Sequence, residues 1–241
     1  MGNSKTIRLR DLVFGPEKPA ICVPIMTRTA AEAVRLASRV RRSSADMAEL
    51  RADALQEEDT RHLKDTVRAV QKALGEKPLL ATFRSRAEGG LSAYPYADAC
   101  RMLTESCADI IDIEWEHPQM RKLLTAAKEA HLPVVVSWHD HTGTPGEETL
   151  LSRFRAMAAS GADLVKIAVM ANSTGDAERL LKAAKAADDA LPVPLIVVAM
   201  GQAGQISRYD PSSFRSALTF GYLDTPGAPG QVPLEKLRGV L

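Results

Sequence analysis

The sequence has little of what marks several large classes of protein. Aromatic residues make up 5% of its 241 residues and the formal net charge is +1, so we expect neither stacking platforms nor a basic surface for nucleic acid. The longest apolar run, residues 191–200, is shorter than the roughly 18 residues of a membrane-spanning helix and is broken by prolines. The N-terminus has no apolar signal region, so secretion is not expected. The sequence therefore predicts no nucleic-acid partner and no membrane partner.

Cysteine is also scarce. Cys22, Cys100 and Cys107 are odd in number and form no C-x-x-C pair, which argues against a disulfide framework and a thiolate zinc site. Cys100 and Cys107 lie seven residues apart in a segment that we predict to be helical, where small thiols are commonly buried. This cysteine usage predicts a reduced, cytoplasmic protein.

Short apolar runs alternate along the chain with segments of helical period. Several of the runs are nearly continuous, as is typical of strands covered on both faces. They are Ile21–Ile25, Asp46–Arg51, Leu79–Arg84, Asp109–Glu114, Val134–His139, Leu164–Val169, Leu195–Met200 and Leu218–Gly221. The clearest helical segments between them are Thr29–Arg42, Thr60–Leu74 and Ala177–Ala190. This alternation is typical of an α/β protein with a parallel sheet.

The number of predicted strands favours a closed (β/α)8 TIM barrel, an architecture of about 250 residues. We expect residues 1–241 to form a single catalytic domain. The alternative, an open doubly wound sheet, normally has a glycine-rich phosphate loop after its first strand, whereas this strand ends in Pro24-Ile25-Met26-Thr27. The segment before residue 21 predicts a short N-terminal β-hairpin that closes the bottom of the barrel.

Polar residues gather where the predicted strands end, which is where a barrel of this kind carries its chemistry. In chain order these ends offer Glu49 and Arg51, Arg84 and Glu88, Asp112 and Glu114, His139 to His141, Lys166 and Arg208. A guanidinium suits a substrate carboxylate, and carboxylates suit hydroxyl groups. The alternative is that these charges pair with one another.

Lys166 lies in the aliphatic segment 162–170. Burial there disfavours the ammonium form and lowers the pKa of the lysine. A neutral amine attacks ketones and forms Schiff bases. The alternative is a lysine paired with a buried carboxylate such as Glu114, or one that reaches the rim, and this residue alone leaves both interpretations open.

His139 ends its predicted strand, where an imidazole can act as a general base near neutral pH. The alternative is a core histidine bonded to a backbone carbonyl. His139 and His141 also form an H-x-H pair that could hold a metal, but the sequence offers no clear third ligand, so we expect no metal site. Lys166 and His139 together predict an imine-forming enzyme that acts on an anionic, hydroxylated ketone.

The motifs at these strand ends resemble those of type I 3-dehydroquinate dehydratase. The similarity runs in order from about residue 10 to residue 231. It is carried by Glu49-Leu-Arg51, residues 82–90 (TFRSRAEGG), Asp112-Ile-Glu114, residues 137–140 (SWHD) with Thr144-Pro145, residues 161–168 (GADLVKIA), Met200 with residues 204–208 (GQISR), residues 219–221 (TFG) and residues 228–231 (APGQ). So many motifs in one order argue against a chance match.

The resemblance implies a specific reaction, the dehydration of 3-dehydroquinate in the shikimate pathway of aromatic amino-acid biosynthesis. Lys166 would attack the C3 ketone, His139 would remove a C2 proton and then protonate the departing C1 hydroxyl, and Glu88 would orient His139. The resemblance also implies a homodimer, no metal or organic cofactor, and substrate contacts from Glu49, Arg51, Arg84, Arg208 and Gln231.

Two positions depart from the family pattern. Gly227 stands where the family usually has a serine that contacts substrate, and His141 stands at the aromatic position of H-D-F. Two other functions remain open. One is a class I aldolase, which also uses a barrel lysine, and the other is a weakly active relative that binds quinate-like acids.

Overall fold

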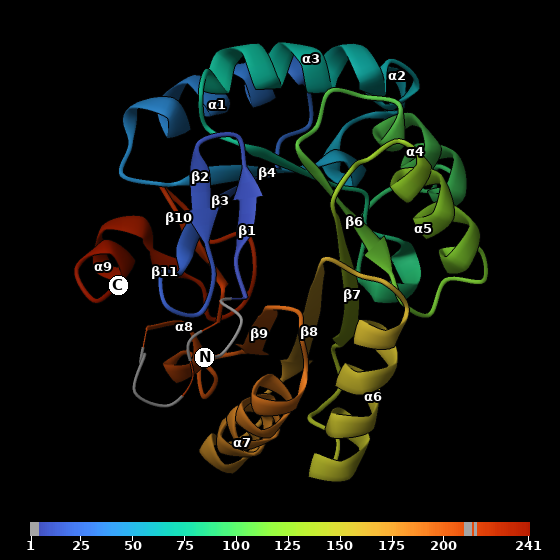
Figure 1. The fold of residues 1–241 in the computed structure, drawn as a ribbon. Helices are drawn as coiled ribbons and strands as arrows, with labels where there is room; N and C mark the ends of the chain where they lie inside the picture. Colours follow the sequence, from blue (N-terminus) through green and yellow to red (C-terminus); the bar gives the residue numbers. More distant parts are fainter. Residues whose placement is uncertain (1–4, 210–213, 215) are drawn as a thin grey trace.

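The computed structural model describes residues 5–209, 214 and 216–241, and its strands form a ring (Figure 1). Eight strands of the ring run parallel: β3 to β9 pair in chain order, and β10 pairs with β3. They are β3 (Ala20–Ile25), β4 (Met47–Arg51), β5 (Leu79–Thr82), β6 (Ile110–Glu114), β7 (Val134–Asp140), β8 (Leu164–Met170), β9 (Leu195–Met200) and β10 (Leu218–Tyr222). A short strand, β11 (Val232–Pro233), extends the sheet beside β10. Each predicted strand is present, with ends that differ by no more than two residues.

The ring closes between β9 and β10. The backbone N–H of Ala217 donates to the carbonyl of Leu195 at 2.9 Å. The hydroxyl of Ser216 accepts from the N–H of Val197 at 3.0 Å and donates to the carbonyl of Leu218 at 2.9 Å. A buried side chain therefore bridges the two strands at this closing point, and the predicted (β/α)8 barrel is confirmed.

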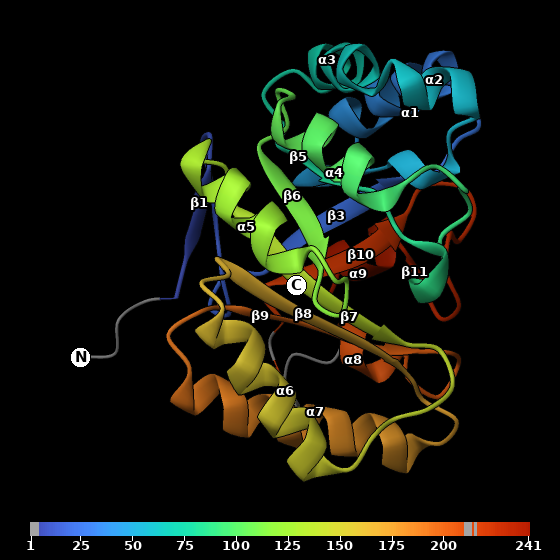
Figure 2. The ribbon, with the colours of Figure 1, turned by 90° about the vertical axis from the view of Figure 1, so that its right-hand side faces the viewer.

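Helices surround the ring (Figures 1 and 2). They are α1 (Ala30–Arg42), α2 (Glu57–Arg61), α3 (Leu63–Leu74), α4 (Tyr96–Thr104), α5 (Met120–Glu129), α6 (Glu147–Ala159), α7 (Thr174–Ala190), α8 (Ile206–Tyr209) and α9 (Leu234–Arg238). Each of the longer helices turns an apolar face to the strands, and capping boxes begin α1 at Thr29 and α7 at Ser173. No helix of the described residues has the length and apolarity needed to cross a bilayer.

Two local predictions need correction. The predicted helix over residues 60–74 is broken at His62, because the buried apolar stripe of α3 begins only at Leu63 and α2 carries mainly exposed charged residues. Cys107 does not lie on a helix with Cys100, since α4 ends at Thr104. Cys100 is buried and Cys107 is exposed.

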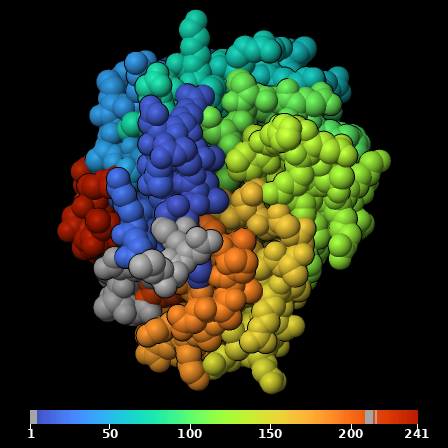
Figure 3. All heavy atoms as spheres, in the orientation of Figure 1, coloured from blue at the N-terminus to red at the C-terminus, as the bar shows by residue number. Residues whose placement is uncertain are grey.

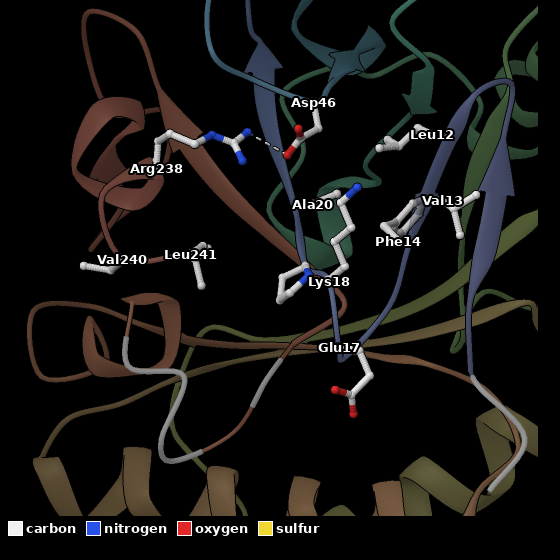
Figure 4. Close-up of a pocket in the computed structure, with 11 residues that line it drawn as sticks. Leu12, Val13, Phe14, Glu17, Lys18, Ala20, Asp46, Arg238, Val240 and Leu241 are labelled. Atoms are coloured by element: carbon white, nitrogen blue, oxygen red, sulfur yellow. Dashed lines mark hydrogen bonds and ion pairs between the residues drawn. The ribbon is translucent and has the colours of Figure 1, made fainter. Parts of the chain in front are cut away.

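The predicted N-terminal hairpin consists of β1 (Ile7–Leu9) and β2 (Leu12–Phe14), which pair antiparallel. It lies across the end of the barrel where the strands begin (Figures 2 and 3). Leu9 and Phe14 are buried there among residues from the inside of the barrel. Between the hairpin and the C-terminal residues lies a cavity of about 220 Å³, in which Arg238 pairs with Asp46 at 2.8 Å (Figure 4). The bottom of the barrel is therefore closed, as predicted.

Candidate active site

A cavity of about 270 Å³ opens at the other end of the barrel, where the strands finish. Its size fits a small molecule. The eight residues that the sequence predicted for the site all line it: Lys166, His139, Glu88, Glu49, Arg51, Arg84, Arg208 and Gln231. Met26, Val198, Met200 and Phe220 contribute apolar surface. The structure therefore brings together polar groups from seven different segments of the chain.

Lys166 lies on β8 with only 7% of its surface exposed. Its Nζ lies 4.9 Å from the centre of the Phe220 ring, and no carboxylate forms an ion pair with it among the described residues. Burial is the largest cause that lowers the pKa of Lys166, and it outweighs the opposing effect of the Glu49 and Asp112 carboxylates. The alternative of a pair with Glu114 is not what the structure shows, because Glu114 accepts from Arg84 instead.

His139 and Glu88 form a buried pair. Nδ1 of His139 lies 2.8 Å from Oε2 of Glu88. Burial, and then the charges of Arg84 and Lys166, hold the pKa of His139 well below its ordinary value. A neutral imidazole whose Nδ1 is engaged by Glu88 presents Nε2 to the cavity, which is the arrangement of a general base.

Arg84 joins the carboxylates at the centre of the site. Its guanidinium donates to Asp112 at 2.9 Å, to Glu114 and Glu88 at 3.2 Å each, and to the hydroxyl of Ser137 at 2.9 Å. Three carboxyl groups surround one cation. Because their negative charges repel one another, one of the three tends to keep its proton. Burial raises the pKa of Glu88 to about 8 in spite of Arg84, so Glu88 is the carboxyl of this cluster that ionises least readily.

A second arginine is fixed by a residue that sequence reasoning missed. Nε and Nη2 of Arg51 donate to the two oxygens of Asp53 at 2.9 and 3.0 Å. Asp53 is fully buried and also accepts from the backbone N–H groups of Arg84 and Leu91, at 3.2 Å each. Asp53 therefore ties the end of β4 to the loop after β5. The signal in the sequence was an acidic residue two positions after Arg51, just beyond a predicted strand.

Thr82 and Ser137 were also missed. The hydroxyl of Thr82 donates to Oε1 of Glu49 at 2.8 Å, and that of Ser137 donates to Asp112 at 2.7 Å. Both hydroxyls lie inside predicted strands, where their spacing does not separate them from core residues, and the signal was their place in the motifs at residues 82–90 and 137–140.

Arg208 is buried, with 4% of its surface exposed, yet no carboxylate pairs with it in the described part of the chain. Its Nη2 donates weakly to the carbonyl of Pro229 at 3.5 Å, and its Nε has no partner among the described residues. Burial alone lowers the pKa of Arg208 to about 10. A buried cation without a carboxylate is suited to an anionic ligand, since the ligand can supply the missing acceptor.

Gln231 lines the same part of the cavity as Arg208. Its Oε1 accepts from the backbone N–H of Gly227 at 2.7 Å, which leaves its Nε2 to donate to a ligand. A Cβ atom on Gly227 would lie 3.0 Å from Sδ of Met26. Met26 therefore limits the space for a serine side chain in place of Gly227.

The H-x-H pair does not form a metal site with other residues. The rings of His139 and His141 are parallel with centroids 6.1 Å apart, and Nε2 of His141 bonds to the backbone carbonyl of Glu88 at 3.0 Å. In residues 5–209, 214 and 216–241, no group of three or more potential ligands is arranged to hold a metal ion.

Comparison with known proteins agrees with this geometry. A sequence model described as type I 3-dehydroquinase matches residues 21–241. The chain is 35% identical to the 3-dehydroquinate dehydratase of Alkaliphilus oremlandii and 37% identical to that of Syntrophotalea carbinolica, with 98% of this chain and 96% of each relative covered.

Solved structures give the same result. The 3-dehydroquinate dehydratase of Geobacillus kaustophilus superposes with a TM-score of 0.92 at 34% identity, covering 98% of this chain and 95% of that one. The type I enzyme of Clostridium difficile, solved with covalently modified comenic acid, gives 0.91 at 30% identity, covering 98% and 96%. On its sequence and its fold, this chain belongs to the type I 3-dehydroquinase family.

Proposed function

We propose that this protein is a 3-dehydroquinate dehydratase, a hydro-lyase of the shikimate pathway of aromatic amino-acid biosynthesis, and that it acts through an imine on Lys166. The observation that carries the proposal is a buried amine without a carboxylate partner among the described residues, in the same cavity as the His139–Glu88 pair. Such an amine is a nucleophile because burial favours its neutral form.

The proposed reaction has four steps: imine formation, removal of the C2 proton, loss of the C1 hydroxyl and hydrolysis of the imine. Nζ of Lys166 adds to the C3 ketone of 3-dehydroquinate. The adduct takes up one proton from solvent, which the final hydrolysis returns, and loses one water to give the protonated imine. His139 takes a proton from C2, and the electron pair left on C2 moves into the imine to form an enamine. The enamine expels the C1 hydroxyl, which receives the proton from His139 and leaves as water. A second water then hydrolyses the imine and releases 3-dehydroshikimate and free Lys166.

The charges around His139 support its two roles. As a base it becomes an imidazolium, and this positive charge 2.8 Å from Glu88 favours ionisation of the Glu88 carboxyl, which in turn stabilises the imidazolium. As an acid it returns that proton to the leaving oxygen. Arg84 supplies a fixed positive charge to the same pair, at 3.2 Å from Glu88.

The polar residues around the cavity divide between the two ends of the substrate. We assign the substrate carboxylate to Arg208 and Gln231, because Arg208 lacks a carboxylate partner in the described residues. We assign the ring hydroxyls to Glu49, Arg51 and Arg84, which line the same cavity from β4 and from the segment after β5. At Gly227, backbone or water contacts take the place of the family's serine hydroxyl.

Trapping with borohydride tests the lysine directly. Hydride reduces the imine carbon to a stable secondary amine, so treatment with 3-dehydroquinate and borohydride should add the dehydrated substrate to the peptide that contains Lys166. Lys166→Ala should give no adduct and no turnover. Lys77→Ala is the matched control, because Lys77 is also partly buried but its Nζ donates to three backbone carbonyls. An adduct on any other lysine, or full activity in Lys166→Ala, would refute the proposal.

The base is tested by a second variant. His139→Ala should still trap the imine but should lose about 10²- to 10⁴-fold in turnover. Full turnover in this variant would contradict the assignment of His139. Product analysis separates dehydration from the carbon–carbon cleavage of an aldolase, and binding without turnover would favour the weakly active relative.

We also propose that residues 1–241 work as one catalytic domain, in the cytoplasm, as a homodimer and without a metal or organic cofactor. The family resemblance supports the homodimer, and the cysteine usage supports a reducing compartment. Light scattering should then give about twice the chain mass of 26.1 kDa. Chelators should leave the rate unchanged, and inhibition that added zinc reverses would contradict the absence of a metal.

A further inference from the structure

His141 contacts the catalytic pair from a direction that the proposed mechanism does not use. Its Nε2 lies 3.0 Å from the backbone carbonyl of Glu88. A carbonyl only accepts, so this nitrogen carries the proton and donates. The described residues contain no other donor to this carbonyl. The end of β7 therefore contacts the short 3₁₀ turn Arg86–Glu88 twice, through His139 at the Glu88 side chain and through His141 at the Glu88 backbone.

The local backbone is shaped to admit this imidazole. Gly89 has a left-handed φ of 83°, and a Cβ atom on it would lie 2.9 Å from Nε2 of His141. At the other side of the turn, the N–H of Glu88 donates to the hydroxyl of Ser85 at 3.3 Å. The peptide that carries Glu88 is thus fixed from both sides, by Ser85 after β5 and by His141 after β7.

The same ring lies against the catalytic histidine. The imidazoles of His139 and His141 are parallel within 10°, with centroids 6.1 Å apart. The other charged groups around His139 are Glu88 on the 3₁₀ turn, Arg84 after β5, Arg51 at the end of β4 and Lys166 on β8. His141 follows β7 directly, two residues beyond His139, with the carboxylate of Asp140 between them in the sequence.

We propose that His141 is a positioning residue for this reaction: it fixes the Glu88 peptide by a hydrogen bond and stacks beside His139, so that the Glu88 carboxyl meets Nδ1 of His139 at 2.8 Å. This inference rests on the proposed function. It goes beyond the proposed function because it gives His141 the role of placing the Glu88–His139 pair and no contact with substrate.

Two substitutions separate the hydrogen bond from the ring. His141→Phe keeps an aromatic ring but removes the donor, whereas His141→Gln keeps a donor at a similar distance from the backbone but removes the ring and its charge. We expect kcat at its pH plateau to fall about threefold to tenfold in His141→Phe, the effect of one neutral hydrogen bond. We expect KM within about twofold of the parent value, and kcat to be restored in His141→Gln.

The electrostatic part has its own readout, which needs no substrate. The titration of the His139 imidazole is followed by NMR in the free protein and assigned by its loss in His139→Ala. His141 is one of the causes that lower the pKa of His139. Both His141 variants should therefore raise the midpoint of this titration. Urea unfolding of each variant checks that the fold is retained.

The kinetic constants and the His139 titration midpoint of the His141 variants can each contradict this proposal. Unchanged kcat and an unchanged His139 midpoint in His141→Phe would overturn it. A rise in KM with unchanged kcat would also overturn it, since His141 would then be a substrate contact. Equal losses of kcat in both variants would show that the hydrogen bond does not position the pair. If the parent protein itself fails to dehydrate 3-dehydroquinate, the proposed function fails, and the NMR titration alone decides whether His141 acts on His139.

Discussion

The buried carboxylate of Asp53 gives the sharpest prediction for stability. It accepts from Nε and Nη2 of Arg51 and from the N–H groups of Arg84 and Leu91. In Asp53→Asn, Oδ1 keeps its two donors, but the amide nitrogen that replaces Oδ2 faces Nη2 of Arg51 and the N–H of Leu91. Two bonds to a charged acceptor are lost, at about 1.5–3 kcal/mol each. We expect the free energy of unfolding to fall by about 3–5 kcal/mol, as for other broken buried pairs.

The same substitution should also affect activity through Arg51. If Arg51 contacts the substrate as proposed, loss of its bidentate partner should raise KM more than it lowers kcat. Urea unfolding followed by circular dichroism measures the first effect, and steady-state kinetics the second. Glu57→Gln is the control, because its ion pair with Arg61 is exposed on α2 and should contribute no more than about 0.5 kcal/mol. Equal unfolding midpoints for Asp53→Asn and the parent protein would refute the reasoning.

Three further predictions follow from other buried groups. Ser216→Ala removes the bridge between β9 and β10 and leaves the N–H of Val197 unpaired, so urea unfolding should show a loss of about 1–3 kcal/mol. Lys77→Met removes the charged donor to three carbonyls after α1 and should lower the free energy of unfolding by about 2 kcal/mol, measured in the same way. Glu88 has a folded pKa raised from 4.5 to about 8, so its stabilising effect is complete below pH 4.5 and is lost as the pH rises to 8. Unfolding measured from pH 5 to 8 should therefore show Glu88→Gln gaining up to about 4 kcal/mol relative to the parent, and a constant difference would contradict the raised pKa.

Much of the barrel could be predicted because its strands are covered on both faces. Runs such as Val134–Asp140 and Leu195–Met200 are apolar with little interruption, and this pattern depends only on local sequence. The break at His62 and the exposed position of Cys107 could not be predicted in the same way. Both depend on where an apolar stripe meets the sheet, which is a property of the packed structure.

The membership of the site was also predictable, because parallel strands bring their carboxyl ends to one place. Lys166 and His139 follow from that rule and from the apolar residues around them. The pairing within the site could not be predicted. The carboxylates that bind Arg84 come from other strands and approach it within about 3 Å. The Arg51–Asp53 pair lies within one segment, but it forms because Asp53 turns inward after β4. Sequence spacing along one strand does not determine those distances.

The hairpin at the bottom of the barrel has a consequence for turnover. Because Leu9 and Phe14 fill the interior where the strands begin, the passage that residues 5–209, 214 and 216–241 leave for substrate, released water and product is the opposite mouth. The product must therefore leave before another substrate molecule enters. Substrate and product should then compete for the free enzyme, so product inhibition should be competitive with respect to substrate.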